Sequence, residues 1–279
     1  MSQKSYDGTP TVYLIPTPIG NLEDITLRAI NVLKKLEIIF SEDTRVTGLL
    51  LKHLNINAKL IANHDYNEYK NKEKMLSYLE KGFDVGIVTD RGTPIISDPG
   101  YELVKFAIEK NYNIVGLPGP TALIPALIVS GIDPKPFLFY GFLNSKDSKR
   151  RKELEELKDY KETLIFYESP HRIEKLLLDI EKIMGNRKIC ISREISKRYE
   201  EVYRGNVIEI KNQMTDVRGE LVIVLEGKKE EIGKQDVPII EQVEKLIQEG
   251  MTSKEAIKKV AHERKIPKNE VYQEFHRGD

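Results

Sequence analysis

The sequence has few of the features that mark secreted or membrane proteins. Its single cysteine, Cys190, excludes an intrachain disulfide framework. Cys190 lies in an apolar run, so we interpret it as a small buried hydrophobe and not as a catalytic thiol. No apolar stretch approaches the roughly 20 residues that span a bilayer, and the polar N-terminus lacks the apolar segment of a signal peptide. These absences predict a cytoplasmic protein.

The chain also carries no net charge, because 44 basic side chains balance 44 acidic ones. A nucleic-acid-binding protein needs a basic patch, but its total charge need not be positive. The balance therefore neither supports nor excludes an RNA partner. The 279 residues suffice for about two domains, and 40% of them are hydrophobic, as in an ordinary globular protein.

Several common catalytic motifs are missing. The sequence contains no G-x-x-x-x-G-K-[ST] loop, no G-x-G-x-x-G after the first apolar run and no G-x-S-x-G. P-loop NTPases, ordinary dinucleotide-binding domains and serine hydrolases are therefore disfavoured. No two histidines have H-x-x-x-H spacing and there is no C-x-x-C. His64, Asp65 and Glu68 could hold a divalent cation, but a hydrogen-bonded polar loop is the simpler interpretation, so we expect no metal.

Strand and helix patterns alternate through the first half of the chain. Short apolar runs predict strands at residues 12–15, 38–40, 59–62, 85–89 and 113–117. Helical spacing predicts helices at residues 25–36, 44–53, 68–81, 101–110 and 121–130. This alternation is typical of an α/β domain with a mostly parallel sheet.

A glycine and two prolines at residues 131–136 predict a linker. Beyond it we expect strands at 137–142, 164–167, 188–192, 207–211 and 220–225, with helices at 146–158 and 173–184. This pattern predicts a second, mixed α+β domain with a partly antiparallel sheet. Helical patterns at 239–248, 253–262 and 268–276 predict a small helical extension, with Thr252 or Ser253 as an N-cap. The predicted domains are residues 1–134, 135–232 and 233–279.

Five polar segments follow the predicted strands of the first domain. They are residues 16–21, 41–45, 64–68, 90–100 and 118–122. Ligands of parallel α/β sheets bind beyond the carboxyl ends of the strands. Any one segment is more simply a turn, but five along one edge predict a site. The glycines and prolines of residues 90–100 suit a rigid loop whose backbone groups surround a neutral or zwitterionic molecule.

The second domain offers charged segments with two interpretations each. Residues 167–172 open a helix with a histidine and an arginine, where an anion can bind. Residues 144–152 are strongly basic, which is typical of a solvated helix face or of contacts to an RNA backbone. Residues 193–198 form a mixed-charge loop. Four tyrosines near the polar loops of the two domains could stack on a splayed base or pack at a core rim: Tyr66, Tyr69, Tyr167 and Tyr199.

Together these motifs resemble the tetrapyrrole methylase superfamily, the class III S-adenosylmethionine methyltransferases. In the first domain the matching stretches are TPIGNLEDITLRA (17–29), SEDTR (41–45), HDYNE (64–68), TDRGTPIISDPG (89–100) and PGPTA (118–122). In the second they are GFL (141–143), FYESPHR (166–172), REISK (193–197) and RGEL (218–221). The stretches occur in order over residues 12–226, so the resemblance covers most of the chain.

The resemblance implies two α/β domains with S-adenosylmethionine in the cleft between them. It implies cofactor contacts at Pro18, Asp90, Gly92, Thr93, Pro94, Ile95, Thr121, Ala122, Phe142 and Leu143. Within the superfamily the motifs are most similar to the branch that acts on small-subunit ribosomal RNA. That branch implies 2′-O-methylation of a cytidine in the decoding region of 16S ribosomal RNA, by an enzyme that is usually a homodimer.

Methyl transfer to a ribose depends on positioning and on removal of the hydroxyl proton. Asp43, Glu168 and Lys197 are candidate proton acceptors, and the sequence does not rank them. The predicted substrate-binding residues are Arg45, His64, Asn67, Lys149, Arg150, Arg151, Lys152, Arg172 and Arg193. A guanidinium stays charged, so the arginines are expected to bind anions and not to act as bases.

Three positions depart from the family pattern. Arg91, Thr121 and Asn144 stand where alanine, serine and proline are common. Arg91 matters most, because a long cation beside the cofactor loop must point outward or alter the pocket. Two other functions stay open: methylation of a tetrapyrrole or other small molecule, and a non-catalytic ribosome-binding factor.

Overall fold

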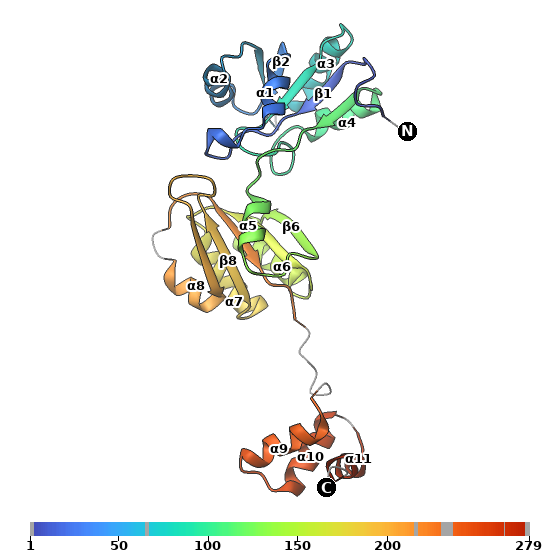
Figure 1. The fold of residues 1–279 in the computed structure, drawn as a ribbon, viewed down its shortest axis with the longest axis vertical. Coiled ribbons are helices and arrows are strands. Elements are labelled where there is room, and N and C mark those ends of the chain that lie inside the picture. The colour runs from blue at the N-terminus through green and yellow to red at the C-terminus, as the bar shows by residue number, and fades with distance from the viewer. Residues whose placement is uncertain (1–2, 65–66, 215–216, 230–236, 265, 277–279) are drawn as a thin grey trace. The chain divides into compact units, whose positions relative to one another are not determined.

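We describe a computed structural model of the chain, which covers residues 3–64, 67–214, 217–229, 237–264 and 266–276. The chain forms two compact units, Met1–Gly227 and Lys228–Asp279 (Figure 1). The predicted boundary at residue 232 lies in the stretch 230–236, outside the described residues.

The first half of the larger unit is built on a parallel sheet, as predicted. Its strands are β1 (Thr11–Leu14), β2 (Ile38–Ser41), β3 (Lys59–Ala62), β4 (Val85–Val88) and β5 (Asn113–Gly116). They lie in the order β3-β2-β4-β1-β5, and every neighbouring pair is parallel. The accompanying helices are η1 (Leu22–Asp24), α1 (Leu27–Leu33), α2 (Thr44–His53), α3 (Glu68–Leu79) and α4 (Tyr101–Glu109).

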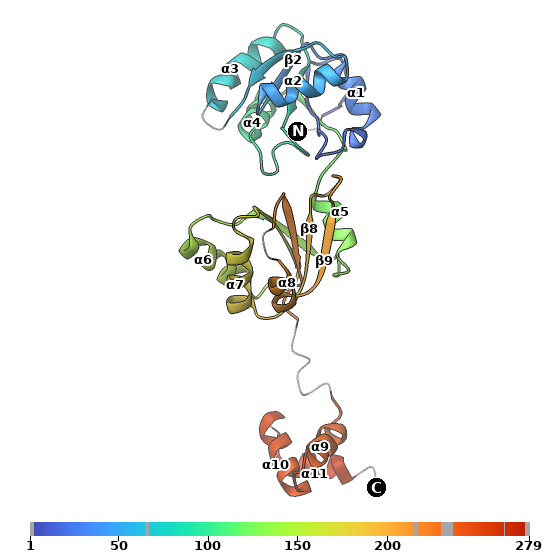
Figure 2. The same cartoon turned by 90° about the vertical axis from the view of Figure 1, so that its left-hand side faces the viewer.

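Helices cover both faces of this sheet (Figure 2). Successive strand residues point to opposite faces, so Phe40 packs with α3 and α4 while Ile39 packs with α1 and α2. Full burial of such a side chain contributes about 1.5–3 kcal/mol. The helix predicted at residues 25–36 begins later, because η1 precedes it and the Thr26 side chain caps α1 through the Ala29 amide, 3.0 Å away.

The second half of the unit holds a mixed sheet, again as predicted. Its strands are β6 (Phe137–Phe142), β7 (Thr163–Glu168), β8 (Lys188–Arg193), β9 (Glu201–Asn206) and β10 (Leu221–Leu225). The order is β6-β7-β10-β8-β9, where β6 and β7 are parallel and the other pairs antiparallel. Its helices are α5 (Leu123–Val129), α6 (Asp147–Leu157), α7 (Ile173–Met184) and α8 (Val207–Gln213).

The strand predicted at residues 207–211 is wrong, because this segment is helix α8. Asn206 and Glu209 form a capping box in which the Glu209 carboxylate accepts from the Asn206 amide at 2.9 Å. Val207 and Ile210, three positions apart, then face the core. The adjacent strand β9 was not predicted, since its alternation of apolar and polar residues is weak.

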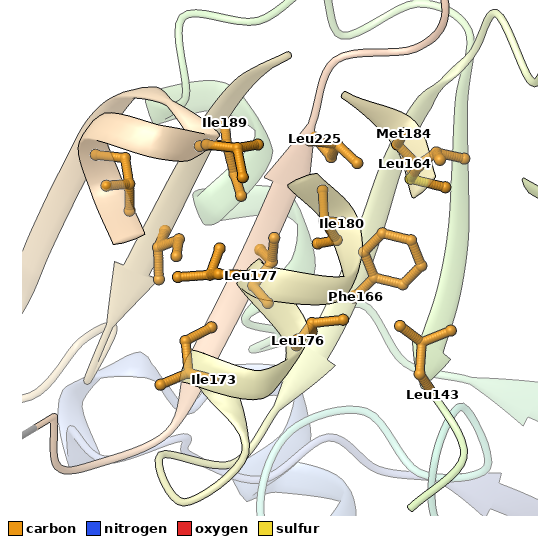
Figure 3. Close-up of a cluster of buried hydrophobic side chains, with 14 of the residues drawn as sticks. Leu143, Leu164, Phe166, Ile173, Leu176, Leu177, Ile180, Met184, Ile189 and Leu225 are labelled. Carbon is orange, nitrogen blue, oxygen red and sulfur yellow. The ribbon is translucent and has the colours of Figure 1, made fainter. Parts of the chain in front are cut away.

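The core of the second sheet lies mainly on one face (Figure 3). Leu176, Leu177 and Ile180 of α7 pack there against Phe166 and other strand residues. On the opposite face α5 packs against β7, β8 and β10, where Cys190 is fully buried. This position confirms the interpretation of the single cysteine as a core residue.

The smaller unit consists of α9 (Ile239–Gln248), α10 (Ser253–Arg264) and α11 (Lys268–His276), close to the three predicted helices. Val243, Ile257 and Val271 belong to its separate apolar cluster. Thr252 serves as the predicted cap, since its hydroxyl accepts from the Glu255 amide at 3.4 Å and its amide donates to the Glu255 carboxylate at 3.0 Å. Among the described residues of the chain, no helix is long and apolar enough to cross a membrane.

Candidate active site

Three of the polar segments after the strands of the first sheet are tied together by hydrogen bonds. The amides and carbonyls of Thr17 and Gly92 pair in both directions, at 2.9 and 3.0 Å. The Thr17 hydroxyl donates to the Thr89 carbonyl at 3.0 Å, and the Thr93 hydroxyl donates to the Pro120 carbonyl at 3.1 Å. The loops after β1, β4 and β5 therefore form one structure at the carboxyl edge of the sheet.

The loop after β4 has an unusual backbone. Gly92 has a φ of +84°, and a Cβ there would lie 3.3 Å from the Ile19 side chain. Ile95 adopts a φ of +79°, which is rare for a β-branched residue. Glycine adopts such a φ readily, whereas the conformation of Ile95 costs on the order of 1–3 kcal/mol, and such costs cluster at functional sites. The cost indicates a loop held in shape for binding.

Carboxylates gather beside this loop. The Thr89 hydroxyl donates to Glu42 at 2.8 Å, and the Asp43 amide donates to Asp90 at 2.9 Å. Burial, together with the charges of Glu42 and Asp90, raises the pKa of Asp98 to about 6. Burial also raises the pKa of Asp90. Closely spaced, poorly solvated carboxylates favour a cationic ligand, because it relieves their mutual repulsion.

Asp43 is engaged at the start of α2. Its carboxylate accepts from the Arg45 amide at 2.8 Å and from the Arg45 guanidinium at 2.5 Å. The Arg45 contacts hold the pKa of the Asp43 carboxyl well below its usual range. Asp43 is therefore a weak base. The Arg45 side chain in the same ion pair is 88% exposed.

The motifs of the second domain also meet at one edge of their sheet. Leu221 lies opposite both Glu168 and Arg193, and Arg193 lies opposite Glu201. Phe142 pairs with Tyr167, the neighbour of Glu168. The ends of β6, β7 and β8 and the starts of β9 and β10 thus bring together segments that are up to about 80 positions apart in the chain.

An ion pair at the end of β7 links this strand end to the segment after β6. The Glu168 side chain has no exposed surface, and its Oε1 accepts from the Ser169 amide at 2.7 Å. Arg172 Nε lies 3.2 Å from the same oxygen, without the alignment of a hydrogen bond. Arg172 also donates to the carbonyls of Leu143 and Asn144, at 2.7 and 3.1 Å. The pair therefore fixes the segment after β6, which resembles a cofactor-binding segment.

Glu168 has two properties of a proton acceptor. Burial raises the pKa of the Glu168 carboxyl. Its second oxygen, Oε2, is buried and has no hydrogen-bond partner within the described residues. An unpaired buried acceptor is costly, so such an atom calls for an explanation in function.

Lys197 is held by two carboxylates. Its Nζ lies 2.8 Å from Glu194 and 2.7 Å from Glu220. Burial alone would lower the pKa of Lys197, but these carboxylates outweigh it and raise the pKa. Arg91 also pairs with Glu220. The guanidinium of this unusual residue thus reaches toward the second sheet, and the side chain is half exposed.

Two cavities lie beside these loops. The larger, about 640 Å³, is lined by Ile19, Thr121 and the turn between β8 and β9. The smaller, about 290 Å³, lies between α2 and the loops after β1 and β4, and includes Pro18 and Asp90. Of the predicted cofactor residues, Thr121 lines the larger cavity, and Pro18 and Asp90 line the smaller one.

Residues 11–211 match the profile of the family Tetrapyrrole (Corrin/Porphyrin) Methylases. The chain belongs to this family. As a member it is a methyltransferase with the two-domain methylase fold, as the sequence predicted.

Three relatives that match nearly the whole chain share one name. A Bacillus subtilis (strain 168) protein named Ribosomal RNA small subunit methyltransferase I is 44% identical, with 98% of each chain covered. Proteins of the same name are 42% identical in Halalkalibacterium halodurans, covering 99% of each chain, and 39% identical in Micromonospora olivasterospora, covering 96% of this chain and 87% of the relative.

Solved methylase structures share the fold at low identity. Uroporphyrin III C-methyltransferase from Thermus thermophilus has a TM-score of 0.55 at 18% identity, covering 77% of this chain and 97% of its own. A cobalt precorrin-4 methyltransferase has a TM-score of 0.58 at 16% identity, covering 81% and 98%. At these identities the likeness shows the fold alone.

The remaining predicted substrate-binding residues of this methylase lie after β3 and on α6. The exposed His64 donates its amide to Asn67 at 2.7 Å, and the Asn67 amide donates to the Ala62 carbonyl at 3.1 Å. Asn67 thus stabilises the turn before α3. Asp65 and Tyr66 of the same motif lie outside the described residues.

Helix α6 corrects one substrate-binding prediction. Arg150 is only 2% exposed and donates twice to Asp179, at 2.9 and 2.6 Å. It lies on the inward face of the helix, so it does not face a substrate. Arg151 shares Asp179 at 2.8 Å, whereas Lys149 is exposed and Lys152 is 80% exposed.

The structure also corrects part of the prediction that Leu143 contacts the cofactor. Its side chain is 2% exposed and belongs to the core of the second sheet. It can therefore offer a ligand only its backbone groups. Its neighbour Phe142 is 54% exposed and remains available to a ligand.

Sequence reasoning missed Asp98 and Glu220. Asp98 stands within the segment 90–100, so its position was signalled, but its raised pKa depends on burial that the sequence does not reveal. Glu220 lies 129 positions from Arg91, and no local pattern links the two.

Proposed function

We propose that the chain transfers a methyl group from S-adenosylmethionine to the 2′-hydroxyl of a cytidine in the decoding region of 16S ribosomal RNA. One observation carries the proposal: relatives named Ribosomal RNA small subunit methyltransferase I are 42–44% identical over almost the whole chain. The corrin and porphyrin methyltransferases of known structure are only 16–18% identical in sequence, and they cover about four-fifths of this chain.

The residues of the candidate site fit the cofactor. S-adenosylmethionine, when bound, supplies an electrophilic methyl group on a positively charged sulfur. Asp90 and Asp98 provide poorly solvated carboxylates suited to a cation. Gly92, which has no Cβ, and the strained Ile95 would let backbone groups approach the ligand closely. The proposed cofactor contacts are Pro18, Asp90, Gly92, Thr93, Pro94, Ile95, Thr121, Ala122, Phe142 and the backbone of Leu143.

Of the three candidate proton acceptors, Glu168 suits the reaction best. Asp43 has a lowered pKa, and Lys197 has a raised pKa that keeps it protonated. Glu168 combines a raised pKa with an unpaired oxygen. Because its side chain is fully buried, this role requires that the segment held by Arg172 move when RNA binds. If that segment stays closed, Glu168 instead positions Arg172.

Basic side chains around the site would contact the RNA backbone. Lys149 and Lys152 are exposed and best placed to neutralise phosphates. Four further residues are proposed contacts: Arg45, His64, Arg151 and Arg172. Arg193 would also contribute, although it is paired with Glu201 at 2.9 Å. Each paired arginine must give up its carboxylate partner to bind a phosphate, which reduces its net contribution to RNA affinity.

We also propose a cytoplasmic homodimer with domains at residues 1–134, 135–232 and 233–279. Ile124, Ile128 and Val129 of α5 are exposed apolar residues, which supports a contact with a second copy. Light scattering of the purified chain tests the dimer, and a monomer at all concentrations would refute it.

Methyl incorporation from labelled S-adenosylmethionine tests the proposed function. The purified chain is mixed separately with naked 16S ribosomal RNA, assembled small subunits and uroporphyrinogen. We expect label in the RNA of one of the first two and none in the porphyrinoid. Label in uroporphyrinogen alone would support small-molecule methylation. No incorporation, with no cofactor binding by calorimetry, would favour a non-catalytic ribosome-binding factor.

A further inference from the structure

Most basic side chains at the carboxyl edge of the second sheet are already neutralised. Arg172 pairs with Glu168, Arg193 with Glu201, and Lys197 with two carboxylates. Arg198 follows directly, and among the described residues it makes no ion pair. Its guanidinium instead lies over the Tyr199 ring, 5.8 Å from the centroid.

Tyr199 differs from the other tyrosine of this edge. The Tyr167 ring packs between Phe139 and Phe142, with centroid distances of 4.9 and 5.6 Å. Tyr199 is 67% exposed. Of these two predicted stacking residues, only Tyr199 presents its ring to a ligand.

The turn that carries Tyr199 is held in a costly conformation. Glu194 and Ser196 both have positive φ angles, +52° and +69°, although neither is glycine. The Ser196 amide donates to Glu200 at 2.6 Å, and the Ser196 hydroxyl bonds to Asp24 of the first domain. These contacts fix the base of the turn, so the Arg198–Tyr199 tip projects from a rigid support.

The first domain also approaches this turn closely. A Cβ on Gly20 would lie 2.3 Å from Lys197 Cγ, so only glycine leaves room for the lysine stem. Ile195, Ser196 and Glu200 of the turn line the larger cavity. The exposed ring therefore stands next to a cavity that Thr121, a proposed cofactor contact, also lines.

We propose that Arg198 and Tyr199 form a stacking platform for an unpaired base of the RNA substrate. The base stacks on the face of Tyr199 opposite Arg198, and the guanidinium neutralises the adjoining phosphate. Stacking on an aromatic ring with a nearby arginine is the usual mode of single-strand binding. The identity of the ligand as RNA rests on the proposed function.

Fluorescence anisotropy with a short labelled single-stranded RNA tests the platform in the full-length chain. Tyr199→Ala should weaken RNA binding roughly 5- to 100-fold, whereas Tyr199→Phe should stay within about twofold of wild type. Arg198→Gln should reduce the slope of log affinity against log salt by about 0.7. Tyr160→Ala is the matched control, because this 43% exposed tyrosine precedes β7, away from the strand end at Glu168.

Two further measurements separate binding from chemistry. Calorimetric affinity for S-adenosylmethionine should be the same in every variant. For labelled methyl transfer to small subunits, Tyr199→Ala should raise KM by the factor seen in RNA binding while kcat changes little.

The outcomes distinguish the platform from the proposed function. The platform is overturned if Tyr199→Ala binds RNA like wild type, if Tyr199→Phe is as weak as Tyr199→Ala, or if the wild-type chain binds no RNA. If the wild type methylates no RNA but binds it in a Tyr199-dependent way, the proposed function fails and the platform stands.

Discussion

Replacing Asp98 by asparagine should stabilise the protein in a pH-dependent way. Burial raises the pKa of Asp98 from 3.8 to about 6. Between these values the folded chain keeps a proton that the unfolded chain has lost, so stability falls as pH rises through this window. Above it both states are ionised, and the folded state bears the full cost of a poorly solvated charge.

The magnitude follows from the shift. A difference of about 2 pK units corresponds to about 3 kcal/mol, which partial solvent screening reduces to about 1–3 kcal/mol. Asp98→Asn removes this cost, so the variant should be more stable than wild type by that amount above about pH 6. Toward pH 4 the difference should become small, because the folded wild-type carboxyl is then protonated and little of its charged form remains to be relieved; it should vanish only below the unfolded-state pKa of 3.8.

Urea unfolding followed by circular dichroism at about pH 4.5 and about pH 7.5 measures the effect. Asp133→Asn is a suitable control, since Asp133 is an exposed aspartate whose Oδ1 accepts from the Lys135 amide, a bond that asparagine can keep. Equal stability changes for Asp98→Asn at both pH values, or destabilisation at the higher pH, would refute the reasoning.

Three further predictions concern other residues. Glu168→Gln should lower kcat roughly 100-fold or more in methyl transfer while calorimetric affinity for S-adenosylmethionine stays within about twofold, because the amide cannot accept the proton; an equal loss of cofactor affinity would instead indicate a positioning role. Arg150→Ala should destabilise the protein by about 3–5 kcal/mol in urea unfolding, since Asp179 would stay buried without this partner; a loss below about 1 kcal/mol would contradict a structural ion pair. The double variant Lys149→Ala and Lys152→Ala should weaken RNA binding and reduce its salt slope by about 1–2 without changing cofactor affinity; an unchanged slope would exclude these lysines from the RNA contact.

The sequence predicted the parts of the fold that depend on local periodicity. The buried parallel strands are short apolar runs, and α2 spans the predicted residues 44–53 because capping and amphipathic spacing agree. The location of the polar loops followed as well, since the carboxyl ends of parallel strands share one edge.

Features that depend on long-range packing could not be predicted from local sequence patterns. Charge density suggested that Arg150 was a surface cation, but its position on α6 directs it inward to Asp179, whereas Lys149 and Lys152 on either side are exposed. The pairing of Arg91 with Glu220 and the raised pKa of Asp98 arise only when distant segments meet. The capping box at Asn206 and Glu209 could have identified α8, but the β-branched residues around it favoured a strand.

Nucleoside mass mapping of small-subunit RNA tests the central claim most directly. RNA is taken from cells that lack this protein, from their parent strain and from cells in which the gene is restored. The account predicts that one 2′-O-methylcytidine of the decoding region disappears without the protein and returns with it. An unchanged set of methylated nucleosides in all three strains would contradict it.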